Sequence, residues 1–271
     1  MATMSIGKAW EEATAFVARE AALLFPVALL FVALPGLILQ EMTPPQLQAW
    51  LAQPKADTIP AMPPGFGLAM VITILLIWFG SLALFALALR PGISVGEALR
   101  MSFARLPVLI GTALVAVGAV AALFVIAAVV GVAIALASKQ MAAAVSMLLG
   151  FGAAGVVFYA SIRLVLLNPV VIDGRLGVMD SLRRAWALTR GHFGRLFGFL
   201  VVVMLLSTIA GSAAQAIIGS LGGLVAGPDG ARLAGGIAGA AVSAVVQVYM
   251  LVMLARLYRQ ALPQDVTDVF R

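Results

Sequence analysis

Long apolar stretches alternate with short charged segments along the whole chain. Six stretches each reach the roughly 20 residues that a helix needs to cross a hydrocarbon layer of about 30 Å. Backbone amides in lipid require internal partners, so stretches of this length predict helices and not strands. The predicted spans are residues 21–40, 66–89, 107–137, 141–167, 196–225 and 233–255.

A short segment of one residue pattern precedes each pair of apolar stretches. The segments begin at Ser5, Ser94 and Gly177, and each reads small, β-branched, variable, charged, small, large apolar, charged. Such self-similarity indicates an internal repeat. We predict one membrane domain, residues 1–271, with repeats at approximately 5–90, 94–168 and 177–260. The alternative is that any alternation of amphipathic and apolar segments aligns in this way.

The third of these segments has the clearest helical periodicity. Its apolar face would hold Trp186, and its polar face would hold Arg183, Arg184 and Arg190. An aromatic ring opposite arginines is typical of a helix lying among lipid headgroups, so Trp186 is a predicted interfacial anchor, as is Trp10 in the first segment. The predicted fold is therefore all-α and polytopic, with six transmembrane helices and three cytoplasmic amphipathic interfacial helices. The third segment can be interpreted either as a lipid-facing docking surface or as an anchor that orients the next span.

Composition supports a membrane protein. The chain is 63% hydrophobic and 10% charged, far from the roughly 25% charged residues of soluble domains. It has no cysteine, which excludes disulfides and thiolate chemistry.

Basic residues predict the orientation. Of the 17 Lys and Arg residues, 14 fall on one side of the predicted spans and 3 on the other, which places both termini in the cytoplasm. The net charge of +6 then belongs to the cytoplasmic face, where anionic headgroups attract it, and it does not imply nucleic acid as a partner.

Residues that usually carry chemistry are scarce. His192 is the one histidine, and no HExxH, GxSxG or phosphate-loop motif accompanies it. We therefore expect no catalytic residues, no metal and no cofactor, and we predict that the protein is not an enzyme.

Few ionisable or polar residues fall inside the spans. None of the eleven acids does, and Arg163 is the one basic residue placed clearly within a span, with a carbonyl, a headgroup or Asp173 as its expected partner. Gln215 and Gln247 are candidates for polar contacts between the last two spans, suited either to packing or to a substrate site.

Small residues predict close helix packing. Gly235, Gly239 and Ser243 follow at steps of four and let backbones approach, either within the chain or between protomers. Residues 46–53 predict a short helix at the outer interface.

Residues 163–173 (RLVLLNPVVID) and 181–191 (SLRRAWALTRG), with Phe193 and the span after it, carry a family resemblance. This region resembles the membrane domain found with some bacterial glycerophosphoryl diester phosphodiesterases and in related stand-alone, uncharacterised inner-membrane proteins. The resemblance implies a membrane module whose own activity is unassigned, located in a bacterial inner membrane. The chain has no further region to hold a phosphodiesterase domain.

These patterns favour a non-enzymatic membrane module that interacts with lipid, as a scaffold or organiser. Its expected partners are membrane lipids with anionic headgroups, and a homo-oligomer or a membrane-protein partner is left open. The alternative is a transporter or flippase-like protein for an amphipathic or anionic solute. The expected headgroup or anion contacts are Arg163, Arg183, Arg184, Arg190 and Arg195.

Overall fold

The computed structural model describes residues 5–53, 60, 62–174 and 176–262, and across these residues the protein is all-helical with no strands. Residues 54–59 and 263–271, which include basic residues counted in predicting the orientation, lie outside this described part. The elements are α1 (Ile6–Ala28), the π-helical turn η1 (Leu29–Ala33), α2 (Leu34–Met42), α3 (Pro45–Ala52), α4 (Phe66–Leu89), α5 (Val95–Ala137), α6 (Lys139–Arg163), α7 (Leu167–Asp173), α8 (Val178–Leu188) and α9 (Phe193–Ala261).

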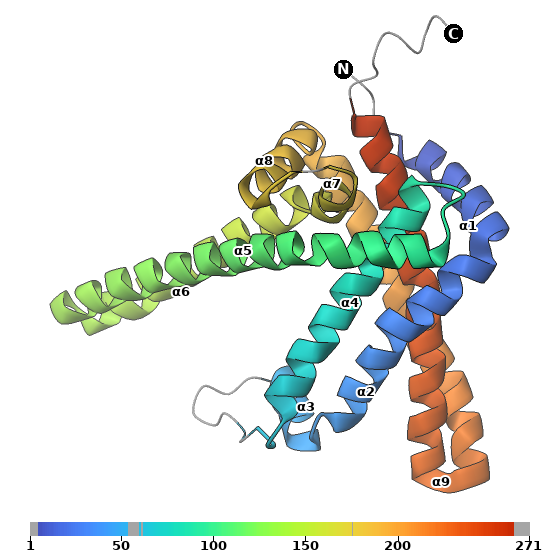
Figure 1. The fold of residues 1–271 in the computed structure, drawn as a ribbon. Coiled ribbons are helices and arrows are strands. Elements are labelled where there is room, and N and C mark those ends of the chain that lie inside the picture. Colours follow the sequence, from blue (N-terminus) through green and yellow to red (C-terminus); the bar gives the residue numbers. More distant parts are fainter. Residues whose placement is uncertain (1–4, 54–59, 61, 175, 263–271) are drawn as a thin grey trace, which may run out of the picture.

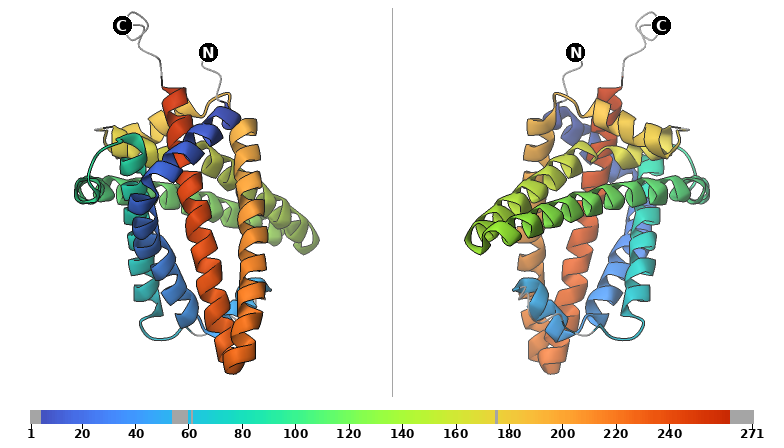
Figure 2. Two further views of the ribbon diagram at one scale, coloured as in Figure 1. Left: turned by 90° about the vertical axis from the view of Figure 1, so that its right-hand side faces the viewer. Right: turned by 90° about the vertical axis from the view of Figure 1, so that its left-hand side faces the viewer.

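Within the described residues, 5 helical segments are long and apolar enough to cross a membrane. The last of them, α9, contains both the fifth and the sixth predicted spans. It reverses direction at Ala226 and Gly227, where Gly227 has a φ of 67°, so that its two arms run antiparallel (Figures 1 and 2). We call residues 193–225 the first arm and residues 228–261 the second arm.

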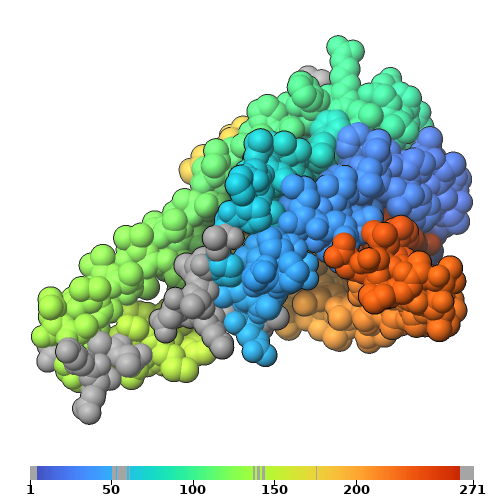
Figure 3. Space-filling view, turned by 90° about the horizontal axis from the view of Figure 1, so that it is seen from below, coloured from blue at the N-terminus to red at the C-terminus, as the bar shows by residue number. Residues whose placement is uncertain are grey.

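Three helical hairpins meet at one end of the molecule and diverge from it (Figure 1). The first pairs α1 and α2 with α4, the second pairs α5 with α6, and the third is α9 itself. The α5–α6 hairpin extends sideways, well beyond the other two, as the view from below also shows (Figure 3).

The buried core is concentrated at the end where the hairpins meet, which we call the convergent end. It comes mainly from α1, the end of α4, α7 and the end of α9, with Phe85, Leu166, Val170 and Val252 among its fully buried side chains. Most of the buried contact between the hairpins therefore lies at this end, and at the other end an ion pair between Glu41 and Arg232 joins α2 to α9.

The diverging parts of the hairpins expose large apolar side chains. Leu136 is 88% exposed, Leu148 is 71% exposed and Leu224 is 84% exposed. Apolar patches of this extent mark a membrane or interaction surface, and together with the long apolar helices they indicate a membrane protein.

The three residues that begin the repeated segments all lie at helix starts. Ser5, Ser94 and Gly177 are the N-cap residues of α1, α5 and α8, and the Ser94 side chain forms a capping box with Glu97. The N-cap preference for Ser explains the first two positions, because its hydroxyl accepts a hydrogen bond from a free backbone N–H group of the first turn.

The small residues at matched places in these segments are buried. Four residues after the caps lie Ala9, Ala98 and Ser181, and eight residues after them lie Ala13, Ser102 and Ala185; all six are 0% exposed. Each segment therefore turns an equivalent narrow face toward the core.

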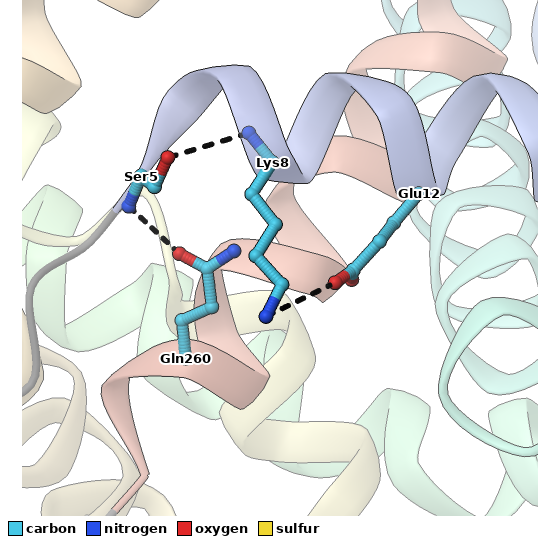
Figure 4. A network of polar contacts seen from close by, with 4 residues as sticks. All are labelled: Ser5, Lys8, Glu12 and Gln260. Atoms are coloured by element: carbon cyan, nitrogen blue, oxygen red, sulfur yellow. Dashed lines mark hydrogen bonds and ion pairs between the residues drawn. The ribbon is translucent and has the colours of Figure 1, made fainter.

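The first and last helices close the bundle. The backbone N–H of Ser5 donates to Gln260 Oε1 at 2.9 Å, and Lys8 pairs with Glu12 at 3.9 Å beside it (Figure 4). Further along, the guanidinium group of Arg256 lies 4.8 Å from the centre of the Phe16 ring. The convergent end is thus closed by contacts between residues near the two ends of the sequence.

The helix boundaries can be compared with the predicted ones. α1 kinks at Glu20, next to the predicted start of the first span, whereas α5 is continuous from its cap into the third predicted span. The helix of the fourth predicted span, α6, ends at Arg163, and α7 begins at Leu167 with Pro169 in its first turn, where proline is tolerated. The short helix predicted at 46–53 is present as α3.

Candidate functional site

A groove runs between α5, α6 and α8 near the convergent end, with a volume of about 620 Å³. Its walls are apolar, and two exposed arginines, Arg183 on α8 and Arg190 in the turn that follows α8, lie at its edge. We call this the basic groove, and its other principal lining residues are Val115, Val120, Leu123, Val156, Leu164 and Trp186.

Arg163 lies behind the basic groove in an aromatic setting. Its guanidinium group is 4.8 Å from the centre of the Trp186 ring and 5.6 Å from that of Tyr159, and the residue is only 6% exposed. Its backbone carbonyl accepts a hydrogen bond from Thr189 at 2.9 Å. Arg163 therefore joins α6 to α8 through its contact with the Trp186 ring, and Asp173, one of its predicted partners, instead accepts a hydrogen bond from Tyr258.

Trp186 is shared between the two settings. One part of its ring receives Arg163, while the residue, 39% exposed, also lines the basic groove. The other predicted anchor, Trp10, is 49% exposed and stacks on Tyr249 at 5.7 Å between ring centres.

The remaining predicted arginines lie away from the basic groove. Arg184 interacts with the hydroxyl group of Tyr258, which donates to Asp173 Oδ2 at 2.9 Å. Arg195 is exposed in the first turns of α9. Of the five predicted headgroup contacts, the structure thus brings together Arg183 and Arg190, with Arg163 behind them.

A second groove, of about 530 Å³, lies between α2 and the two arms of α9. Gln215 and Gln247, the two predicted intramembrane polar residues, both line it. Side chains from Gln40, Ser207, Thr208, Ser212 and Ser243 add further amide and hydroxyl groups. We call this the polar groove.

The predicted packing stripe divides into two parts. A Cβ atom on Gly235 would lie 3.0 Å from the carbonyl oxygen of Gln215, so this glycine permits close contact between the arms of α9. Gly239 and Ser243 instead line the polar groove. The closest approach of the arms is nearer the reversal, where a Cβ on Gly222 would lie 2.4 Å from the carbonyl oxygen of Gly230.

Sequence reasoning did not place α2 in the polar groove or α5 and α6 in the basic groove. The only feature of the sequence that pointed to α2 in the polar groove was the amide of Gln40, near the end of a predicted span. Within the described part of the chain, no group of three or more His, Asp or Glu residues is arranged to hold a metal ion.

Comparison with known families gives one match. The family model described as "Domain of unknown function (DUF7847)" matches residues 4–261. The comparisons with curated proteins and with solved structures gave no match.

Proposed function

The chain belongs to this family, DUF7847, and from that premise we propose that the protein is a non-enzymatic membrane module that binds anionic lipid. The observation that carries the proposal is the basic groove, which combines an apolar wall for acyl chains with Arg183 and Arg190 at its edge. Guanidinium groups make paired hydrogen bonds to phosphate, and basic residues near a membrane surface attract anionic lipid by about 1 kcal/mol each.

The neighbouring aromatic residues support this assignment. Trp186 presents an amphipathic ring at the level of the two arginines, a position that indole rings favour at membrane surfaces. Arg163 holds that ring from behind, so the groove has a fixed edge. In the scaffold function that we propose, the bound lipid would anchor the convergent end to the headgroup layer.

The test is retention of phosphatidylglycerol by the full-length protein in nanodiscs that also contain phosphatidylcholine, measured by native mass spectrometry. Arg183→Gln with Arg190→Gln should reduce the retained phosphatidylglycerol, by about 2 kcal/mol in binding free energy for two basic residues. Arg184→Gln is the matched control, because Arg184 interacts with Tyr258 and lies outside the groove. Equal loss in both variants, or no loss in the double variant, would contradict the proposal.

We also propose the finer topology: six spans, three interfacial segments and a threefold repeat, with both termini in the cytoplasm of a bacterial inner membrane. Three contacts support the repeat. Arg90, Arg163 and Arg256, each at or near the end of a returning helix, contact Met101, Trp186 and Phe16 in the first helix of the following unit. The third contact leads back from the last unit to the first, as a cyclic arrangement requires.

The resemblance to the membrane domain of glycerophosphoryl diester phosphodiesterases is kept within this proposal. The segment that carries it, residues 163–191, includes the end of α6, α7 and α8, and it supplies one wall of the basic groove. The same resemblance supports the bacterial location.

A transporter or flippase-like protein is the second candidate function, and the polar groove favours it. Gln215 and Gln247 line a common space, as a solute site at that depth requires, but Arg163 lies outside it. The two functions differ in which groove carries the ligand, so each can be tested with its own set of variants.

A further inference from the structure

The polar groove is formed by three helical walls within the apolar part of the molecule. α2 lies beside α9, as the space-filling view shows, and the two arms of α9 complete the groove (Figure 3). Its volume of about 530 Å³ is in the range of about 300–1,000 Å³ that is typical of ligand pockets.

Two amide side chains in this groove have unused hydrogen-bonding capacity. Among the described residues, no group forms a hydrogen bond with the side chain of Gln215 or Gln247. Each of these amides has two N–H donors and one oxygen acceptor. The hydroxyl groups of Thr208 and Ser212, by contrast, donate to carbonyls of their own helix. Polar groups surrounded by hydrocarbon need a partner, so the amides require water or a ligand.

The lining of the polar groove is uncharged. The nearest charges are Glu41 and Arg232, which pair at 2.8 Å between α2 and the second arm, beyond Gly236. Because this pair is balanced, the groove offers hydrogen bonds but no net charge to its ligand. The chemistry differs from that of the basic groove, and it disfavours a phosphate or carboxylate.

The borders of the groove indicate how a ligand would reach it. Leu34 on α2 is 46% exposed and Ile209 on the first arm is 64% exposed, so apolar surface lies on both sides. Toward the convergent end the groove stops at Ala244 and Val248, which are buried. Access is therefore from the side, out of the surrounding lipid, or from the diverging end.

We propose that the polar groove binds an uncharged, hydroxyl-rich group, a sugar or polyol, through the amides of Gln215 and Gln247. Hydroxyls pair well with amides because each can both donate and accept. This site is separate from the basic groove and does not depend on anionic-lipid binding there.

The natural absence of cysteine makes a direct test practical. Ser243→Cys places a thiol in the groove, and Val245→Cys places one on the same arm, where Val245 is 41% exposed to the lipid side. Each full-length variant is reconstituted in nanodiscs and treated with a hydrophilic, membrane-impermeant maleimide. We expect labelling of Ser243→Cys and little or none of Val245→Cys, because only the groove holds water or a polar ligand.

The ligand class is then tested by protection of Ser243→Cys. Monoglucosyl diacylglycerol in the nanodisc should slow labelling, whereas phosphatidic acid should not. Protection by free glucose as well would identify a soluble sugar or polyol as the source, and protection by the glycolipid alone would identify a lipid headgroup. Gln215→Leu with Gln247→Leu should remove the protection, while Gln48→Leu, on α3 and outside the groove, should keep it.

Three results would overturn the proposal: no labelling of Ser243→Cys, equal protection by phosphatidic acid, or no protection by either form of the sugar. Thermal unfolding of each variant in detergent separates loss of binding from loss of fold. Should the double leucine variant unfold, Gln247→Leu alone provides the same comparison.

Discussion

At the scale of single residues, Arg163 shows how a buried charge is accommodated near the membrane surface. Its guanidinium group contacts two aromatic rings, and its Nε has no hydrogen-bond partner among the described residues. A cation over an aromatic face is stabilised by about 2 kcal/mol when both groups are desolvated. The arginine therefore fixes α8 to α6 while leaving the outward edge of Trp186 for the basic groove.

This contact predicts a measurable coupling between Arg163 and Trp186. In a double-mutant cycle with Arg163→Gln and Trp186→Leu, we expect a coupling energy of about 1–2 kcal/mol in the free energy of unfolding. Tyr249, which stacks on Trp10 instead, serves as the comparison partner for Arg163. A coupling with Trp186 no larger than that with Tyr249 would show that the ring contact does not stabilise the protein. The measurement is unfolding in mixed detergent micelles.

Residue-level prediction from sequence succeeded where the chemistry is local. Ser5 and Ser94 cap helices because a hydroxyl meets the first free N–H groups, and this depends only on nearby residues. The different settings of Arg183 and Arg184 could not be predicted in the same way. Helical periodicity places both on a polar face, but it does not say that Tyr258, more than seventy residues away, contacts one of them.

At the scale of elements, the α9 hairpin depends on backbone contact between its arms. Gly222 and Gly230 approach so closely that any side chain would displace the opposite backbone. Small residues at such contacts let helices pack tightly in lipid, where the hydrophobic effect does not hold helices together. The same contact sets the width of the polar groove farther along the arms.

Gly222→Ala should therefore destabilise the protein, by about 1–3 kcal/mol, because overpacking at a tight contact forces the backbones apart. Gly198→Ala, in the first arm with nothing within 4 Å of the added carbon, should leave stability unchanged or raise it. The thermal unfolding midpoint in detergent gives the comparison. Similar midpoints for the two variants would mean that the arms separate without cost.

The long apolar helices were predictable from the length and composition of the apolar stretches, and the kink at Glu20 lies where the first span was expected to begin. The sideways direction of the α5–α6 hairpin was not predictable (Figure 1). Hydropathy reports the length of a helix and its environment but not its angle to other helices, which packing decides. For the same reason the sequence did not assign α2 to the polar groove.

At the scale of the whole molecule, the charge distribution predicts orientation. Most arginines of the described residues lie at the convergent end. At the diverging end, Arg232 is paired with Glu41, so the pair has no net charge. A reporter fused after Arg271 should be active only in the cytoplasm, and the same reporter inserted after Gly227, at the reversal of α9, should be active only on the opposite side. Activity of both fusions on one side would contradict the proposed topology.

The contact between α1 and the end of α9 also determines when the fold is completed during synthesis. Each hairpin can insert in the bilayer as it leaves the ribosome, but the narrow face of α1 at Ala9 and Ala13 is covered only after the last helix has been made. Until then the inner face of the first hairpin remains exposed to lipid and to other proteins. A chain interrupted before the second arm would thus leave the apolar inner face of α1 uncovered.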